Sequence, residues 1–388
     1  MRILIDCRFW GTKHTGLGRY TENLVTNLLK IDKKNEYILL SSSKNNIIIE
    51  QYGNITVLPV NAAYYSLKEQ LVLPKLIHKL KPDLIHFPHF NVPILTNFPF
   101  VVTIHDLIKH HSRGRETTTH QALFYWTKFL GYKLVFRKAV YKAKKIIVPS
   151  NFVKRELKKI YHLPEENIKV VYEGVSNKFK INPPSLSWRS GEKLKIGKQK
   201  LKILKKIKKP YLLYVGNLYP HKNIRRLILA IKLLNQFRRI NLVIVCGRDV
   251  FWRRIKNAAV EFKAEKFISL PGFAADKDLA VLYAQAEAFV SPSLIEGFGL
   301  PGLEAMVLGC PVICSNIPTF KEIYGKSAYY FNPRDIDDIK DKILHVLNFS
   351  FRKRQVMIKK GLFQASKYSW QECAQETLEV YQGIVNNW

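Results

Sequence analysis

The stretch Ser291-Pro-Ser-Leu-Ile-Glu296-Gly-Phe-Gly-Leu-Pro-Gly-Leu-Glu304 decides the fold of the second half of this chain. The apolar residues 288–290 before it predict a buried strand, and two glycines give the following turn backbone freedom. Pro301 suits the first turn of a helix that we expect to run to about Leu308. Free amides at that helix start would face an anion beyond the carboxyl end of the strand. The stretch therefore predicts a binding site, with an ordinary turn in which Glu304 complements the helix dipole as the alternative.

Strands and helices alternate outward from this junction through both halves of the chain. Apolar runs predict strands at residues 3–5, 37–40, 84–87, 100–104 and 145–148, then 211–215, 242–245, 267–270, 288–290 and 311–314. Helices are expected from about residue 18 to 29, at 224–237 and at 371–385. This alternation predicts an α/β protein with two doubly wound, mostly parallel sheets.

A change of composition separates the two halves. After residue 182 a Pro/Ser passage is followed by nine lysines between residues 193 and 209, and we expect a linker with a basic helix there. The predicted organisation is an N-terminal Rossmann-like domain (1–182), a Lys-rich linker (183–209), a C-terminal Rossmann-like domain (210–370), and a final helix (371–388) that crosses back to the first domain.

Length and composition indicate a large globular protein. The 388 residues suit two domains, and a hydrophobic content of 47% can fill two cores. The N-terminus reads directly as a strand without the regions of a signal peptide, and no apolar run approaches roughly 18 residues, so we expect a cytoplasmic location. The five scattered cysteines include no Cys-x-x-Cys pair and are expected to be reduced core residues.

The charge balance is strongly basic, with 63 Lys and Arg against 30 Asp and Glu, a formal net charge of +33. Such a charge favours an anionic partner surface, either nucleic acid or anionic lipid. No zinc-finger spacing, basic zipper or RNA-stacking motif is present, so no nucleic-acid partner is expected. Residues 124–145 interleave aromatic residues with Lys and Arg, which is typical of a helix on a membrane surface. A helix with a core-facing apolar side and solvated charges is the alternative.

Taken together, these motifs resemble the nucleotide-sugar glycosyltransferases of family 4, also called the group 1 glycosyl transferases. The family signature is a Glu, seven residues and a second Glu, which Glu296 and Glu304 match. The resemblance extends through Thr15-Gly-Leu-Gly-Arg-Tyr20, Val102-Thr-Ile-His-Asp106, Ile146-Ile-Val-Pro-Ser-Asn151, Val171-Tyr-Glu-Gly-Val175, Tyr214-Val-Gly-Asn217 with Lys222-Asn223, and Tyr368-Ser-Trp370. It implies the GT-B fold, in which two Rossmann-like domains face a cleft, and a retaining glycosyltransferase as the activity.

The resemblance also implies roles for residues of the second domain. Lys222 would meet the pyrophosphate of the donor, Glu304 would bind the ribose hydroxyls, and Glu296 would lie against the transferred sugar. The remaining donor-binding residues that we expect in this domain are Gly216, Asn217, Gly247, Gly272, Phe273, Gly297, Phe298, Gly299 and Leu300. Many relatives carry Arg where this chain has Asn217, and either His221 or Arg225 could replace that phosphate donor.

In the first domain, Gly16 and Gly18 would let a loop approach the distal phosphate or the acceptor after the first strand. His105 follows a predicted strand and should point into the cleft, and the resemblance implies that it approaches the donor sugar. A hydrogen-bonded structural histidine is the alternative. Asp106 could orient His105 or accept a proton from the acceptor. His86 is expected to be a satisfied buried residue.

No metal site or cofactor is expected. Asp335 and Asp337 have the Asp-x-Asp spacing of metal-using glycosyltransferases, but they open a predicted surface helix, where acidic residues are ordinary. Cations and backbone amides would then stabilise the departing nucleoside diphosphate. The resemblance implies retention of the anomeric configuration by a route in which the departing phosphate helps to deprotonate the acceptor, and we adopt that route as a hypothesis. A double displacement would need a covalent nucleophile, and no residue can be assigned that role from the sequence.

The sequences of the motifs at residues 15–20 and 214–223 look most like those of bacterial and archaeal mannosyltransferases that assemble surface polysaccharides. This favours GDP-mannose as the donor and a lipid-linked or polysaccharide acceptor, with a UDP-sugar donor as an alternative. A non-catalytic basic protein that binds nucleic acid or membranes would explain the charge but not the glutamate pair. A nicotinamide-dependent dehydrogenase is disfavoured, because no Gly-x-Gly-x-x-Gly with a distal acid follows the first strand.

Overall fold

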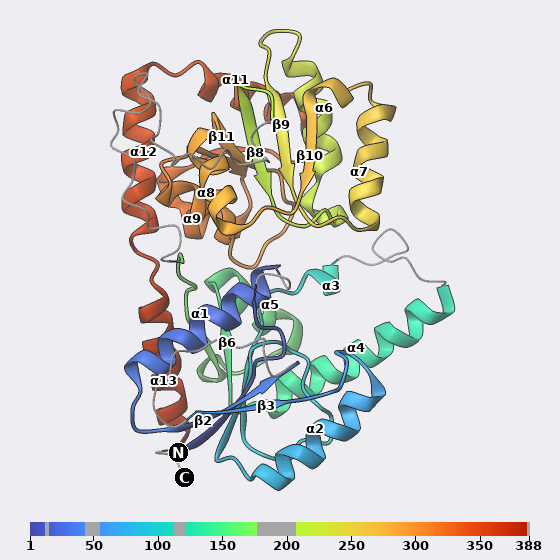
Figure 1. The fold of residues 1–388 in the computed structure, drawn as a ribbon, viewed down its shortest axis with the longest axis vertical. Coiled ribbons are helices and arrows are strands. Elements are labelled where there is room, and N and C mark those ends of the chain that lie inside the picture. Colours follow the sequence, from blue (N-terminus) through green and yellow to red (C-terminus); the bar gives the residue numbers. More distant parts are fainter. Residues whose placement is uncertain (12–14, 43–54, 112–121, 177–206, 386–388) are drawn as a thin grey trace. The chain divides into compact units, whose positions relative to one another are not determined.

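The computed structural model describes residues 1–11, 15–42, 55–111, 122–176 and 207–385. The chain divides into two compact units, the first formed by Met1–Gly174 and Ser369–Trp388 and the second by Val175–Tyr368 (Figure 1). Most of the expected Lys-rich linker, residues 183–209, lies outside the described residues, which resume at 207.

The first unit is built on a seven-stranded parallel sheet. Its strands read as short apolar runs because parallel strands are covered on both faces. In spatial order they are β3 (Ile55–Pro59), β2 (Glu36–Ser41), β1 (Arg2–Asp6), β4 (Leu84–Phe87), β5 (Phe100–Thr103), β6 (Lys145–Val148) and β7 (Ile168–Val170).

Helices connect these strands and cover the sheet. They are α1 (Thr15–Ile31), α2 (Leu67–Leu80), α3 (Ile108–His111), α4 (Ala122–Lys142) and α5 (Asn151–Tyr161), with a short 3-10 helix η3 (Glu165–Asn167) before β7. The C-terminal helix α13 (Trp370–Val385) also belongs to this unit and lies beside α1 (Figure 1). Tyr20, Leu24 and Leu28 repeat at four-residue spacing on α1 and are all buried, so this helix presents one apolar stripe to the core.

The second unit has a six-stranded parallel sheet. Its spatial order is β10 (Ile268–Gly272), β9 (Asn241–Val245), β8 (Tyr211–Val215), β11 (Ala288–Ser291), β12 (Val312–Ser315) and β13 (Tyr329–Phe331). The central pair β8 and β11 aligns Leu212 with Ala288 and Leu213 with Phe289. The carboxyl ends of these two strands therefore lie next to each other at one edge of the sheet.

The helices of the second unit follow the same alternation. They are α6 (Ile224–Leu234), α7 (Val250–Glu261), α8 (Asp276–Gln285), α9 (Leu300–Val307), α10 (Pro318–Tyr324), α11 (Ile336–Leu347) and α12 (Phe351–Ala365). Within the described residues they are accompanied by the 3-10 helices η7 (Pro220–Lys222), η8 (Glu265–Phe267) and η9 (Gly325–Ser327). Helix α6 packs against α7 and α11, and α12 packs against α9.

The prediction of two parallel-sheet α/β domains is confirmed, with three strands missed and some boundaries moved. The sequence did not reveal β3, β7 or β13. Helix α1 begins at Thr15 and not near Gly18, and α6 ends at Leu234 and not at Phe237. Side-chain caps account for several starts, as at Ser150, whose hydroxyl accepts from the amide of Val153 at 3.3 Å.

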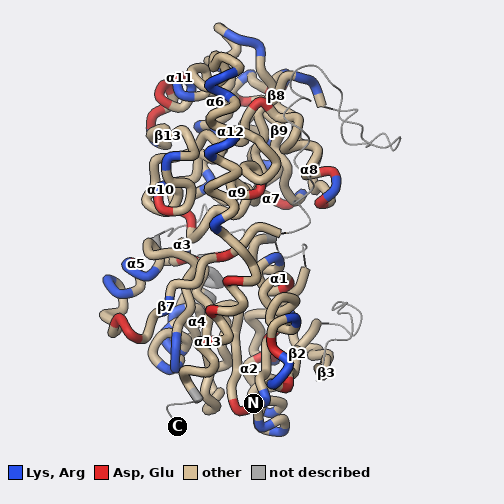
Figure 2. The backbone as a smooth tube through the Cα atoms, turned by 90° about the vertical axis from the view of Figure 1, so that its left-hand side faces the viewer, with Lys and Arg blue, Asp and Glu red and all other residues tan. Residues whose placement is uncertain are grey.

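Each unit has its own apolar core, and all five cysteines are buried thiols that form no disulfide bond, as expected. Lys and Arg are spread over the helices of both units, including α5 and α12 (Figure 2). Among the described residues we find no helix with both the length and the apolarity to span a membrane.

Candidate functional site

Two loops at the carboxyl edge of the second sheet hold the strongest candidate residues. One loop follows β8 and forms η7, which ends at Lys222. The other follows β11 and carries Glu296. The amide of Leu294 donates to the carbonyl of His221 at 2.8 Å, which ties the two loops together. Residues that are more than 70 positions apart in the sequence are thus brought into contact.

Lys222 and Glu296 form the central interaction of this site. The Lys222 Nζ atom lies 2.6 Å from Glu296 Oε1, and the side chains are only 13% and 15% exposed. The Ser293 hydroxyl donates to the same Oε1 atom at 2.7 Å. No described residue forms a hydrogen bond or ion pair with Glu296 Oε2, so this atom is available to a ligand. The pair combines a cation and a carboxylate oxygen in a site that is largely shielded from water.

The charge state of Glu296 follows from its neighbours. Burial alone would raise the pKa of its carboxyl, but the charge and hydrogen bond of Lys222 leave that pKa below its ordinary value. The pKa of His221 is also lowered, to about 4, because burial and the adjacent Lys222 disfavour its charged form. Near neutral pH the site therefore contains an ionised Glu296 and a neutral His221.

Asn223 fixes the loop geometry around this pair. It adopts a left-handed backbone conformation with φ of 61°, which asparagine tolerates better than most residues. Its Nδ2 atom donates to the carbonyls of Pro292 at 3.1 Å and of Pro333 at 2.7 Å. One side chain thereby joins the loops after β8, β11 and β13.

Helix α9 positions Glu304 beside the loop that carries Glu296. Glu304 is buried, and the Tyr283 hydroxyl donates to its Oε2 atom at 3.2 Å. Gly299 caps the helix with φ of 105°, and its carbonyl accepts from the Tyr324 hydroxyl at 2.5 Å. The predicted strand, glycine turn and helix with Pro301 in its first turn are therefore confirmed.

The flanks of this turn are also ordered. Gly297 and Phe298 are buried, Leu300 opens α9, and the Phe298 ring meets Tyr368 edge to face with centroids 5.6 Å apart. Phe298 thus packs into its own unit.

Other expected donor residues follow the carboxyl ends of neighbouring strands. Gly216 comes directly after β8, and the Asn217 carbonyl accepts from the Tyr214 hydroxyl at 2.6 Å. The Asn217 Oδ1 atom is buried without a hydrogen-bond donor among the described residues. Of the two candidates to replace the missing arginine, Arg225 is engaged by Glu261 at 3.0 Å on the surface, whereas His221 lies beside Lys222.

Gly247 and Gly272 lie at the ends of the adjacent strands β9 and β10. A side chain at Gly272 would meet Arg248, whose guanidinium donates to the Pro271 carbonyl at 3.2 Å. Gly247 has open space at the position of a Cβ atom, and the Phe273 ring is exposed. The backbone at Gly247 and the ring of Phe273 are therefore accessible beyond the carboxyl ends of β9 and β10.

In the first unit, His105 follows β5 and is held by two acceptors. Its Nδ1 atom lies 3.1 Å from Glu173 Oε1, and its Nε2 atom lies 2.9 Å from the Pro88 carbonyl oxygen. A carboxylate and a carbonyl oxygen both accept hydrogen bonds, so this arrangement favours donation from both ring nitrogens, which is the imidazolium form. Burial opposes that form, but the Glu173 hydrogen bond and charge together with the Pro88 carbonyl raise the pKa of His105 above its ordinary value. Both nitrogens are therefore occupied in this structure.

Asp106 and the two N-terminal glycines also have local structural roles. Asp106 Oδ1 accepts from the amide of Ile108 at the start of α3. Gly16 and Gly18 lie in the first turn of α1 and not in a loop before it. A Cβ atom at Gly18 would approach the Gly11 carbonyl oxygen to 1.9 Å, so glycine is needed for this close backbone contact. Gly16 is exposed with open space around it.

His86 is a hydrogen-bonded buried residue, and Asp335 lies at the start of a helix, as the sequence predicted. His86 is fully buried, with Nδ1 2.5 Å from the Tyr381 hydroxyl and Nε2 2.9 Å from Thr103 Oγ1. Asp335 caps α11 by accepting from the amides of Asp337 and Asp338. In the described part of the chain no three His, Cys, Asp or Glu side chains gather in a group that could hold a metal ion.

Sequence reasoning missed Glu173 and Ser293 as site residues. Glu173 lies within the motif Val171-Tyr-Glu-Gly-Val175, which was noticed but given no role. Ser293 lies within the opening stretch, three residues before Glu296, a spacing that a turn makes compatible with a side-chain contact. The Ser293 contact could have been predicted from its motif, whereas no sequence spacing linked Glu173 to His105.

Two parallel-sheet α/β domains, one of which carries paired glutamates and a lysine at its carboxyl edge, define the GT-B class of glycosyltransferases. Residues 14–179 match the family described as Glycosyltransferase Family 4, and residues 196–362 match the family described as Glycosyl transferases group 1. The chain belongs to these group 1, family 4 glycosyltransferases.

Individual relatives agree with this assignment. The O-antigen chain mannosyltransferase B of Escherichia coli is 27% identical over 95% of this chain and 96% of its own length. The O-antigen chain mannosyltransferase RfbU of Salmonella typhimurium is also 27% identical, over 86% of this chain and 87% of its own. Among solved structures, HepE of Anabaena in complex with UDP and glucose matches with a TM-score of 0.69 and 17% identity, over 98% of this chain and 99% of its own.

Proposed function

We propose that this chain transfers mannose from GDP-mannose, with retention of anomeric configuration and without a metal ion, to a lipid-linked or polysaccharide acceptor in the synthesis of a cell-surface glycan. The observation that carries this proposal is the shielded pair of Lys222 and Glu296 at the carboxyl edge of the second sheet. The names of the two O-antigen mannosyltransferases support mannose as the transferred sugar.

The charges of the pair suit a departing nucleoside diphosphate. An ammonium group has three N–H donors, and Lys222 uses one of them for Glu296. The others can donate to the pyrophosphate, whose negative charge increases as the glycosidic bond breaks. In a site with little water, such a fixed cation stabilises that charge strongly.

Glu296 has the charge state needed to act on the sugar. Its lowered pKa keeps it ionised, so it would not serve as a proton donor. Its available Oε2 atom can accept from a sugar hydroxyl or stabilise positive character at the anomeric carbon. In this proposal the departing phosphate, and not Glu296, takes the proton of the acceptor on the same face of the sugar.

The other proposed contacts to the sugar-nucleotide donor within this unit lie at the carboxyl edge of the same sheet. Glu304 would accept from the ribose hydroxyls through the carboxylate that Tyr283 orients. Backbone at Gly247 and Gly272 would approach the nucleobase, with Phe273 beside it. His105 and Asp106 of the first unit would contribute to the sugar and acceptor side, His105 as a cation.

The test is a panel of nucleotide sugars with the purified protein. Thermal stabilisation and slow hydrolysis of each would be recorded in the presence of a chelator, for the wild type and for Glu296→Gln and Lys222→Ala. Glu265→Gln and Lys277→Ala change exposed residues of the same unit in the same way and serve as matched controls. We expect GDP-mannose alone to be hydrolysed, and both site variants to lose turnover that both controls keep.

Two alternatives give different results in this panel. A response to UDP-sugars only would move the donor to the UDP class, as with the UDP complex of HepE, and leave the reaction type unchanged. Full activity in Glu296→Gln would reject the role of that carboxylate. No binding of any nucleotide sugar would favour a non-catalytic basic protein.

We also propose that the chain acts at the inner face of an anionic membrane through helix α4. The expected aromatic and basic stretch divides between two faces of this helix. Phe136, Ala139 and Val140 are buried in the core, whereas Trp126, Leu130 and Leu134 are 59%, 62% and 54% exposed at four-residue spacing. Lys133 and Arg137 alternate with this exposed stripe, which suits lipid tails flanked by anionic headgroups.

A further inference from the structure

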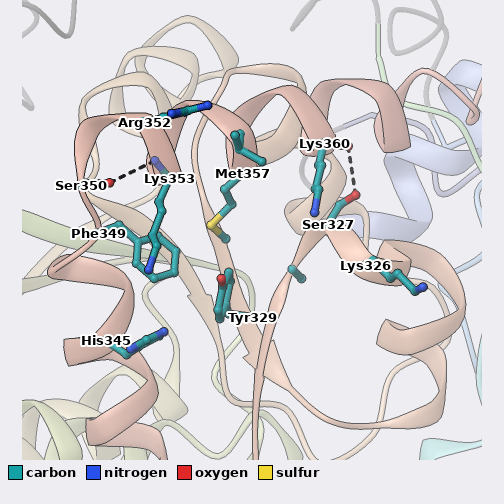
Figure 3. Close-up of a pocket in the computed structure, with 12 residues that line it drawn as sticks. Lys326, Ser327, Tyr329, His345, Phe349, Ser350, Arg352, Lys353, Met357 and Lys360 are labelled. Carbon is teal, nitrogen blue, oxygen red and sulfur yellow. Dashed lines mark hydrogen bonds between the residues drawn. The ribbon is translucent and has the colours of Figure 1, made fainter.

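A cavity in the second unit lies away from the residues discussed so far. It has a volume of about 570 Å³ and opens between helix α12, the end of α11, and the segment from η9 to the start of β13. Its lining residues are Lys326, Ser327, Ala328, Tyr329, His345, Phe349, Ser350, Arg352, Lys353, Val356, Met357 and Lys360 (Figure 3).

The sheet topology separates this cavity from the Lys222–Glu296 site. All six strands are parallel, so their amino ends share one edge and their carboxyl ends share the other. Lys222 and Glu296 follow the carboxyl ends of β8 and β11. Lys326 and Ser327 precede the amino end of β13. The cavity therefore lies at the opposite edge and does not belong to the proposed donor site.

The lining is cationic, and none of the described residues that form it carries a carboxylate. Four Lys or Arg side chains contribute to it, together with His345. Lys353 and Lys360 extend from α12 toward the space, whereas Arg352 and Lys326 point outward at its rim (Figure 3). Within the described residues, none of these four cations forms an ion pair with an acidic side chain.

The local sequence makes this excess of positive charge unusual. Residues 351–367 contain six Lys or Arg and no Asp or Glu. Among the described residues, Arg354 is the one of these six cations with an acidic partner, since its guanidinium lies 3.2 Å from Glu287 outside the cavity. Cations held close together repel one another, and a bound anion would remove that cost. The amino end of α12 at Ser350 adds the positive end of a helix dipole.

The wall between the two inward lysines is apolar and aromatic. Met357 and Tyr329 lie between Lys353 and Lys360 in Figure 3. The Phe349 ring meets Tyr329 at 4.9 Å and His345 at 5.1 Å between centroids, both edge to face. Such a wall favours a ligand in which an anionic group is joined to a less polar portion. Solvated lysines on an open helix would have no such enclosure.

We infer that this cavity is a second ligand site, which binds a phosphate ester through Lys353 and Lys360 and contacts the attached group through Tyr329, Phe349 and Met357. Lysine ammonium groups and helix amino ends both donate to phosphate oxygens. The ester has two possible sources, a soluble sugar phosphate or the headgroup of an anionic lipid. This inference concerns a site outside the proposed donor edge and does not depend on which sugar is transferred.

Methionine methyl NMR offers a local test, because the chain has three methionines: Met1, Met306 and Met357. The full chain would be labelled at the methionine methyl carbons, and Met357→Leu would identify the Met357 signal. Titrations would use inorganic phosphate, glucose 1-phosphate, and phosphatidylcholine vesicles with and without phosphatidylglycerol. The cavity variant is Lys353→Ala/Lys360→Ala, and the matched control is Lys359→Ala/Lys367→Ala, which removes two exposed lysines outside the cavity.

We expect a saturable shift of the Met357 signal that is weakened at least about tenfold in the cavity variant and less than about twofold in the control, because two charged hydrogen bonds are lost. A response to soluble phosphates identifies a soluble ligand, and a response confined to phosphatidylglycerol vesicles identifies a lipid headgroup. No shift in any arm, or equal weakening in both variants, would overturn the inference. An unchanged signal of buried Met306 shows that both variants are folded.

Discussion

Arg8 is a buried cation held by two carboxylates in the first unit. Its guanidinium donates to both oxygens of Asp6 at 2.7 Å and to Glu69 Oε1 at 2.5 Å, and the residue is 1% exposed. Glu69 also accepts from the amide of Tyr65 and from Asn91 Nδ2. The network joins the carboxyl end of β1 to α2, and its carboxylates depend on Arg8 for charge balance.

We predict that Arg8→Ala lowers the free energy of unfolding of the first unit by about 3–5 kcal/mol, because it leaves two buried carboxylates without a cation. Hydrogen–deuterium exchange should become faster in peptides from β1 and α2, while peptides of the second unit keep their protection. Arg155→Ala on the exposed side of α5 is the control and should change stability by no more than about 0.5 kcal/mol. Unchanged exchange in β1 would show that the network adds little.

His105 provides a second test at the level of single residues, because its raised pKa depends on Glu173. A raised folded-state pKa means that the ion pair stabilises the fold fully below the unfolded value of about 6.5 and loses this contribution as pH rises through the folded value. We predict that Glu173→Gln lowers the His105 pKa measured by NMR. The stability difference between wild type and Glu173→Gln should then shrink as pH rises. A difference independent of pH would indicate that His105 is neutral.

The same residues show what a sequence can reveal about a site. Glu296 and Glu304 could be found because their eight-residue separation and their glycine turn lie within one short segment. The contact between Lys222 and Glu296 could not, since it depends on the adjacency of β8 and β11, which the chain connects through two other strands. The contact between His105 and Glu173 spans 68 positions and likewise has no linear signal.

At the level of elements, α9 shows how glycine positions a functional helix. A Cβ atom at Gly302 would lie 2.4 Å from the Tyr324 ring and hydroxyl. That hydroxyl donates to the Gly299 carbonyl and so holds the turn that precedes Glu304. The absence of a side chain at Gly302 therefore permits the close contact between α9 and α10.

We predict that Gly302→Ala lowers the free energy of unfolding of the second unit by about 1–3 kcal/mol, because the added methyl group overlaps a buried ring. Gly131→Ala is the matched control on α4, where nothing lies within 4 Å of the added methyl group. That control should stabilise the protein by about 0.5–1 kcal/mol, because alanine is the better helix former. Thermal unfolding of both variants measures the contrast. Equal effects of the two substitutions would mean that Tyr324 moves aside freely.

Elements at the sheet edges were the hardest to predict. The missed strands β3, β7 and β13 have three to five residues, and each ends its sheet. Strand β3 is mostly half-exposed, so its residues lack the continuous apolar run of a central strand. The central strands are buried on both faces and were found close to their observed bounds. The cavity near β13 escaped prediction for a related reason, since its lining comes from three separate segments with no shared motif.

At the scale of the whole molecule, the net charge of +33 favours binding to an anionic surface. Opposite charge attracts the protein to an anionic bilayer over a distance that salt controls, about 10 Å at 0.1 M and about 3 Å at 1 M. Charge alone would give weak, salt-sensitive association. The exposed Trp126, Leu130 and Leu134 of α4 would add burial of apolar surface, which salt does not screen.

We therefore predict binding to phosphatidylglycerol vesicles with two separable contributions. High salt should weaken flotation of the wild type with these vesicles, and phosphatidylcholine vesicles should bind little at any salt concentration. Leu130→Ser/Leu134→Ser should weaken binding by about tenfold or more at low salt, because each leucine side chain contributes up to about 1.5–3 kcal/mol when buried. Val260→Ser, an exposed apolar position of α7, is the control and should bind as the wild type does. Equal binding to neutral vesicles, or no loss in the α4 variant, would reject α4 as the membrane contact and leave the positive charge to the cavity beside α12 or to another anion.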